Sequence, residues 1–209
     1  MLRQFISLKG RKPSSEYINF VKWSFITNVI VSIETALSTS NMLEGISGKD
    51  VDSGVRTLNY IGKDIIGQIG GVLYISSMSH KADDDPKRFL MYSNLLQQCS
   101  MIALASTPLV PSSGFLVIAG TANILTNISF TGFGAINAKC IQALSPDGTD
   151  IGEIYSKLTA VNTAASSIGL AAGVVITTLV PDPSARVALL PVLGIARVYS
   201  LDRAVNSYI

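Results

Sequence analysis

The sequence has few charged residues, and none at all over a long central stretch. Asp, Glu, Lys and Arg make up 14% of the 209 residues, whereas soluble domains contain about 25%. Residues 89–138 contain no Asp, Glu, Lys, Arg or His. Because a water-exposed helix normally carries charge on its outer face, this deficit favours lipid over water as the surrounding medium.

The central stretch predicts two helices joined by a turn. Residues 107–114 contain two prolines together with Ser and Gly, and proline breaks a helix because it lacks the N–H and clashes with the preceding turn. The flanking runs 89–106 and 115–138 are close to the roughly 20 residues that cross about 30 Å of hydrocarbon. We therefore predict an all-α fold, a polytopic transmembrane bundle of about six helices with a central charge-free helical hairpin. The alternative is a hairpin in the core of a soluble protein.

Motifs of enzymes, metal sites and nucleic-acid-binding proteins are also missing. The two cysteines, Cys99 and Cys140, lie in no CxxC motif or His/Cys cluster, so no disulfide framework or zinc site is indicated. No GxSxG, P-loop or HExxH motif occurs, and the single histidine, His80, has no nucleophile motif beside it. A net charge of +2 does not argue for nucleic acid. We expect a non-enzymatic protein with no cofactor, no metal and no nucleic-acid partner.

Two regions are distinguished at the level of domains. Residues 1–12 form a basic N-terminal flank, and residues 13–209 are predicted to form a single transmembrane helical domain. The flank has four basic residues and no acid before Glu16. This pattern fits a short organellar targeting sequence, and it also fits the basic flank that orients a first membrane helix. No cleavable signal peptide is expected.

The first predicted helix contains one carboxylate that needs an explanation. Residues 13–16, with a Ser N-cap and an acid, predict its start, and apolar residues recur from 17 to 43. Glu34 interrupts this pattern. Since a carboxylate at bilayer depth is costly, we expect Glu34 to face the bundle interior or a water-filled cavity; the alternative is an interfacial helix with Glu34 in water. From Glu44 we expect a polar loop that turns helical toward Val55.

Small residues mark two helix-packing surfaces. Gly67 and Gly71 form a GxxxG pair, which lets helix backbones approach closely in a membrane. Residues 158–181 are free of charge and rich in Ala, Ser and Gly, including Gly169 and Gly173. We expect both segments to pack tightly against other helices.

Prolines and charges divide the rest of the chain. Residues 83–88, Asp-Asp-Asp-Pro-Lys-Arg, predict a helix start, because Asp is a good cap and Pro suits the first turn; this explains the aspartates better than a metal site. The last helix, residues 185–207, is interrupted by Pro191 and either spans with a kink or lies on the surface. If all six helices cross, most basic residues fall on one side, as the positive-inside rule expects for an even number of crossings.

Several of these segments together resemble a known family. Residues 63–71, KDIIGQIGG, resemble the KDGxGxxG-type segment of the root UVB sensitive (RUS, DUF647) family. Residues 85–88, DPKR, resemble a second element of that family at the expected distance. Residues 13–15 with Tyr17 and Trp23 are similar to its opening pattern, and residues 35–43 to the stretch that follows it. Asn123, residues 132–139 and residues 150–173 are similar to its later helices. One departure is Ile65, which stands where the family has glycine.

The resemblance implies an integral membrane protein, in a mitochondrial or plastid membrane or alternatively in the endomembrane system. In plants this family is linked to light-dependent seedling development and to vitamin B6 homeostasis, and its biochemical activity is not settled. The resemblance therefore implies a compartment and a fold rather than a reaction.

Two functions fit these observations. The first is a small-solute carrier or binding protein, since polar groups within membrane helices often line pathways; the alternative is that Asn and Gln only hydrogen-bond between helices. The candidate solute-binding or family-motif residues are Glu34, Lys63, Asp64, Gln68, Asp85, Lys87, Arg88 and Asn123, and further polar residues in apolar helices are Asn94, Gln97, Gln98, Asn127, Asn162 and Ser166. The second function is a structural or assembly subunit of a larger membrane complex. The expected partners are the lipid bilayer, other membrane subunits or a second copy of the chain, and an unknown solute.

Overall fold

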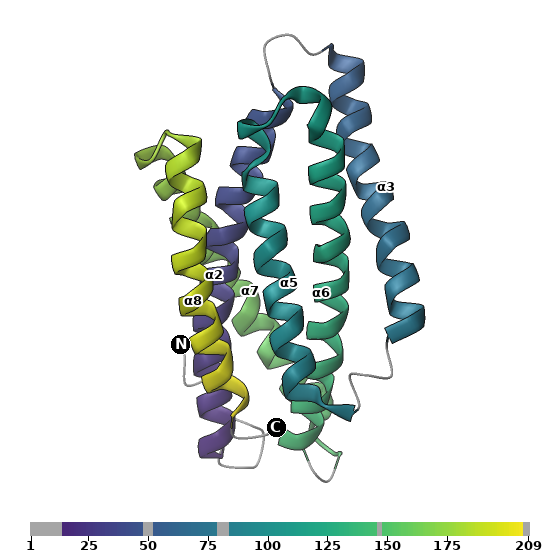
Figure 1. Cartoon of the computed structure of the whole chain (residues 1–209). Helices are drawn as coiled ribbons and strands as arrows, with labels where there is room; N and C mark the ends of the chain where they lie inside the picture. The colour runs from purple at the N-terminus through teal and green to yellow at the C-terminus, as the bar shows by residue number, and fades with distance from the viewer. Residues whose placement is uncertain (1–13, 48–51, 79–83, 146–147, 207–209) are drawn as a thin grey trace.

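The structure, a computed structural model, describes residues 14–47, 52–78, 84–145 and 148–206, and within these ranges it contains α-helices and short 3₁₀ turns but no strand. The helices are α2 (Ser15–Ile46), α3 (Ser53–Met78), α5 (Pro86–Ala105), α6 (Phe115–Leu144), α7 (Ile151–Leu179) and α8 (Pro183–Val205). Figure 1 shows them lying side by side, with consecutive helices running in opposite directions. The predicted helical bundle is confirmed. The basic flank of residues 1–12, His80 and Asp83 lie outside the described residues.

Local sequence signals set the helix starts. Ser14 caps α2, its side chain accepting a hydrogen bond from the backbone N–H of Tyr17 at 3.1 Å. Asp85 does the same for α5, accepting from the N–H of Arg88 at 3.0 Å. Asp182 caps α8, with Pro183 in its first turn. Each cap satisfies N–H groups that have no partner inside the helix.

The central hairpin is formed by α5 and α6. They are joined by the 3₁₀ turns η1 (Thr107–Leu109) and η2 (Ser112–Gly114), at the prolines that predicted the break (Figure 1). The polar loop expected from Glu44 is wrong at its beginning, because α2 continues to Ile46 and α3 begins at Ser53. Glu44 remains helical and forms an ion pair with Arg186 of α8. Glu is a strong helix former, so a polar residue of this kind does not end a helix.

Four helical segments are long and apolar enough to cross a membrane: Ser15–Ile46, Ser112–Leu144, Ile151–Leu179 and Pro183–Val205. The remaining two described helices, α3 and α5, do not meet this criterion. Polar side chains lower the mean hydropathy of α5. Three of them, Ser93, Asn94 and Gln97, are nevertheless buried in the bundle, and Tyr92 and Leu95 face outward. Six crossings remain a prediction, as does the orientation of the bundle.

The helix α2 lies in the middle of the packing, in contact with α5, α7 and α8, whereas α3 packs mainly on α6 at the edge of the bundle (Figure 1). Buried side chains from five helices, including Phe20, Leu90, Ile136, Leu158 and Leu201, make the largest apolar cluster. Pro191 lies inside α8, which packs along α2 and α5 rather than standing apart from the bundle. This arrangement leaves a cavity between the helices that is partly open to the outside, since Phe130, one of its lining residues, is 57% exposed.

Candidate functional site

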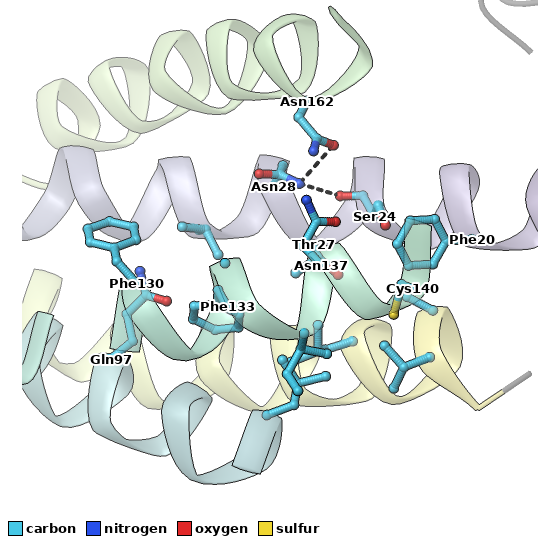
Figure 2. A pocket seen from close by; sticks show the side chains of 17 residues that line it. Phe20, Ser24, Thr27, Asn28, Gln97, Phe130, Phe133, Asn137, Cys140 and Asn162 are labelled. Carbon is cyan, nitrogen blue, oxygen red and sulfur yellow. Dashed lines mark hydrogen bonds between the residues drawn. The ribbon is translucent and has the colours of Figure 1, made fainter. Parts of the chain in front are cut away.

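A cavity of about 360 Å³ lies between α2, α5, α6, α7 and α8 (Figure 2). This volume is within the range of about 300–1,000 Å³ that small-molecule sites occupy. Its polar lining comes from Ser24, Thr27, Asn28, Gln97, Asn137 and Asn162. Its apolar lining includes Phe20, Phe130 and Phe133. The cavity therefore presents hydrogen-bonding groups and aromatic surface together.

The α2 side of the cavity is held in place by hydrogen bonds between helices. Asn28 Nδ2 donates to the backbone oxygen of Ser24 at 2.8 Å and to Asn162 Oδ1 of α7 at 3.0 Å (Figure 2). Thr27 Oγ1 donates to the backbone oxygen of Trp23 and shares a 2.8 Å hydrogen bond with Ser200 of α8. These bonds fix the positions of the side chains before any solute is present.

On the α5 side, Gln97 lines the cavity and has a buried amide nitrogen without a hydrogen-bond partner. Its side chain is only 1% exposed, and the atom without a partner is Nε2. A buried polar group without a partner costs roughly 1–3 kcal/mol. A water molecule or a polar group of a solute in the cavity would remove that cost.

Beside the cavity, α2 and α8 share a buried ion pair. Glu34 Oε2 lies 2.7 Å from Arg197 Nη1, and both side chains are 0% exposed. Arg197 Nη2 donates to the backbone oxygen of Asn94 in α5 at 2.9 Å. The expectation that Glu34 faces the bundle interior agrees with this geometry. Because isolated charges are very costly in a low-dielectric interior, each of these residues requires the other.

More unpartnered atoms surround this ion pair. Asn94 is wholly buried, and neither its Nδ2 nor its Oδ1 has a hydrogen-bond partner. Arg197 Nε and Gln98 Oε1 are also buried without a partner, although Gln98 Nε2 donates to the Leu190 oxygen at 2.8 Å. Donors and acceptors are thus both present, which is the pattern that ordered water or a solute with hydroxyl or amide groups satisfies.

The second buried arginine is different because its donors are satisfied. Arg186 donates to Asn41 Oδ1 at 2.9 Å and to the backbone oxygens of Val180 and Pro181, and it forms an ion pair with Glu44. These contacts fasten the α7–α8 connection to the end of α2. We assign Arg186 a structural role.

Lys63, Asp64 and Asn123 come together, but away from the cavity. Lys63 Nζ lies 2.6 Å from Asp64 Oδ1. Asn123 Nδ2 of α6 donates to the same Asp64 oxygen at 3.0 Å and to the backbone oxygen of Lys63 at 3.1 Å. None of the three lines the cavity. Their contacts join α3 to α6.

The glycines selected from the sequence lie at close helix contacts. A Cβ atom added at Gly67 would lie 2.7 Å from Asn123 Cγ, and one added at Gly71 would lie 2.8 Å from Asn127 Cβ, both on α6. Gly169 and Gly173 of α7 face the α2 backbone, where an added Cβ would meet the Val29 oxygen, Ser32, Ile33 and Ala36. Both pairs allow neighbouring backbones to approach.

The remaining candidates lie outside the cavity as well. Asp85 is the cap of α5, and Arg88 is exposed on its first turn. Lys87 lies 3.5 Å from Asp202, which joins the beginning of α5 to the end of α8. Gln68 is exposed on α3.

Sequence reasoning did not single out Arg197 as the partner of Glu34, nor Asn28 and Asn137 as cavity residues. A signal for Arg197 was present, since it is the single charge within the run 187–201, and a charge among apolar residues of a helix requires a partner of opposite sign. The sequence could not show which helix carries that partner.

Comparisons with known proteins agree with the resemblance. The sequence profile of a family described as the vitamin B6 photo-protection and homoeostasis domain matches residues 12–208. The chain is 27% identical over 187 residues to protein root UVB sensitive 5 of Arabidopsis thaliana, covering 84% of this chain and 36% of that protein. It is 26% identical over 183 residues to protein root UVB sensitive 4 of the same plant, covering 87% and 35%.

No solved structure matches the chain. The chain spans only about a third of the length of the curated relatives it matches. The family profile nevertheless covers nearly every residue of the chain, and its match includes every helix described above. The chain belongs to the root UVB sensitive (DUF647) family.

Proposed function

We propose that this chain is a non-enzymatic membrane protein that binds a small polar solute in the cavity between α2, α5, α6, α7 and α8, and that it carries this solute across the membrane. The proposed location is a mitochondrial or plastid membrane, with the endomembrane system as the alternative. The observation that carries the proposal is the side chain of Gln97, which is 1% exposed, lines a cavity of about 360 Å³ and has no hydrogen-bond partner for its Nε2. A group of this kind is well suited to recognise a solute, because binding satisfies it.

The position of the cavity supports a carrier. Five helices contribute to its wall, and four of the five contain segments that are long and apolar enough to cross a membrane. Binding sites of membrane carriers lie between helices, where buried polar side chains replace the water that a solute loses. Alternate opening of such a cavity to the two sides would move the bound solute.

The family description suggests which solutes to test first. It names vitamin B6, whose vitamers are small pyridine rings with hydroxyl groups. A ring of this kind matches a wall that combines Phe130 and Phe133 with amides such as Asn137. We propose a vitamin B6 vitamer as the solute.

Equilibrium dialysis with the purified protein in detergent or nanodiscs tests this function. Pyridoxine should bind saturably to the natural protein, and Gln97→Leu should weaken binding at least about fivefold, since one hydrogen bond contributes about 1 kcal/mol. Gln142→Leu is the matched control, because Gln142 is exposed on α6 and does not line the cavity. Absence of saturable binding, or equal binding by both variants and the natural protein, would reject the proposal.

A second candidate is an assembly role, and a specific observation on α3 favours it. Gln68 is exposed among the exposed apolar residues Ile65, Ile69 and Val72. A polar side chain on a lipid-facing surface gains a hydrogen bond when another membrane helix covers it. If α3 contacts a partner subunit or a second copy, Gln68→Leu should reduce the native size of the protein in mild detergent.

A further inference from the structure

The wall of the cavity carries no charge. Among the described residues that line it there is no Asp, Glu, Lys, Arg or His. Its polar groups are the hydroxyls of Ser24 and Thr27 and four carboxamides. A charged solute would therefore lose part of its hydration without meeting an opposite charge, and such a transfer is unfavourable.

The buried ion pair of Glu34 and Arg197 does not make the binding of a charged solute more favourable. Glu34 and Arg197 neutralise each other at 2.7 Å, and Arg197 also donates to the Asn94 oxygen. An anion that took Arg197 would leave Glu34 as an unpaired buried carboxylate, and a cation that took Glu34 would leave Arg197 unpaired. Breaking a buried pair in this way is costly, so the pair resists exchange with a charged ligand.

The wall instead has the chemistry of an uncharged, hydrogen-bonding ligand. Carboxamides both donate and accept hydrogen bonds, and the wall supplies those of Asn28, Gln97, Asn137 and Asn162. Phe130 and Phe133 lie near Gln97 at one end of the cavity, and Phe20 lies beside Cys140 at the other end (Figure 2). Aromatic walls favour flat rings, which pack against them by offset stacking or by edge-to-face contact.

We propose that the cavity is selective for an uncharged solute that carries hydroxyl or amide groups on a flat ring, and that it excludes phosphate esters, carboxylates and ammonium ions. This inference rests on the proposed function and specifies the class of solute. Applied to vitamin B6, it selects the free, unphosphorylated alcohol form. The phosphorylated cofactor form is excluded, since none of the lining residues can pair with a phosphate.

Three compounds with one ring and different charges test this selectivity. Pyridoxine has no net charge near pH 7, pyridoxamine carries a protonated amine, and pyridoxine 5′-phosphate is an anion. Isothermal titration of the protein in nanodiscs should show pyridoxine binding at least tenfold more tightly than the other two, because a charge buried without a partner costs several kcal/mol, or roughly a hundredfold or more in affinity.

A charge introduced into the wall provides the complementary test. In Asn162→Asp, the new carboxylate can still accept the hydrogen bond from Asn28 Nδ2, so the local structure is preserved. The ratio of the pyridoxamine affinity to the pyridoxine affinity should then be at least tenfold higher than in the natural protein. Gln142→Glu places the same charge outside the cavity and should leave the ratio of the two affinities unchanged.

The possible outcomes separate the inference from the proposed function. Tighter binding of pyridoxine than of the two charged compounds, with the affinity ratio of pyridoxamine to pyridoxine changed only in Asn162→Asp, supports both the inference and the proposed function. If pyridoxine 5′-phosphate binds as tightly as pyridoxine, or if the ratio is the same in all three proteins, the inference is overturned while the solute-binding function stands. If none of the three compounds binds a protein that unfolds cooperatively, the proposed function is rejected and the inference with it.

Discussion

Glu34 and Arg197, 163 residues apart in the sequence, form an ion pair of 2.7 Å with both side chains fully buried. The pair joins α2 to α8, and the hydrogen bond from Arg197 to the Asn94 oxygen extends the link to α5. Three helices are thus held together by one guanidinium group. Its position beside the cavity suggests that the fold of the bundle and the shape of the solute site depend on the same contacts.

Removal of one member of this pair should destabilise the bundle strongly. Arg197→Met leaves the Glu34 carboxylate buried without its counter-charge, and breaking a buried pair costs about 3–5 kcal/mol. The double variant Glu34→Gln/Arg197→Met should recover much of this loss, since no charge remains. Unfolding in mixed micelles with increasing SDS measures both values. A single variant as stable as the natural protein would show that the pair is not maintained in the membrane.

The glycines of α3 should tolerate no large side chain. Gly71→Leu places a side chain against Asn127, 2.8 Å from the nearest atom already at Cβ, and overpacking of this kind costs about 1–3 kcal/mol. Gly134→Leu on α6 is the matched control, because nothing lies within 4 Å of its Cβ position. Replacement of a glycine in the middle of a helix, where the new side chain meets no other atom, stabilises the folded protein by about 0.5–1 kcal/mol. Equal stability of the two variants in detergent would contradict the close contact of α3 and α6.

Gly45 is not a suitable control position for Gly71, because it lies at a close contact in the structure. The sequence places it in a polar loop, where a large residue would be harmless. It lies instead near the end of α2, and its Cβ would meet the backbone of Thr107 at 3.0 Å and that of Pro108 at 3.1 Å. Gly45→Leu should therefore destabilise the protein as well, which a detergent melting curve can compare directly with Gly134→Leu.

Gln97→Leu should affect binding and stability in opposite directions. The variant removes a buried amide nitrogen that has no hydrogen-bond partner, so the free protein should become as stable as the natural protein or more stable. Binding of an uncharged solute should weaken, as described above. Thermal unfolding with and without solute measures both effects. A variant that is less stable but binds normally would indicate that Gln97 has only a packing role.

Features set by neighbouring residues could be predicted from the sequence. The cap at Ser14, the Asp85-Pro86 helix start and the break at residues 107–114 depend on contacts within a few residues, and all are present. The interior position of Glu34 also followed from the cost of a charge in lipid. These inferences required no knowledge of the three-dimensional arrangement.

Features set by distant residues could not be predicted. The partner of Glu34 is on the last helix, and Glu44 near the end of α2 pairs with Arg186 of α8. The sequence offers the family-motif residues Lys63 and Asp64 as candidates for solute binding, yet they lie at the contact of α3 with α6. Which polar residues meet in one cavity depends on how each helix is rotated about its axis and on which helices are neighbours. The hydropathy pattern of the sequence determines neither.

The most direct test of the account is the reactivity of Cys140, whose thiol is buried but lines the cavity. In a Cys99→Ser variant in native-like membranes, Cys140 should react with a small uncharged methanethiosulfonate reagent. It should react much more slowly with the sulfonate and trimethylammonium analogues, because the wall holds no counter-charge for them. Because all three reagents react with the same thiolate, the ratio of their rates is the readout. Equal rates for all three, after division by their rates with a free thiol, would contradict an uncharged, solute-accessible cavity between the helices.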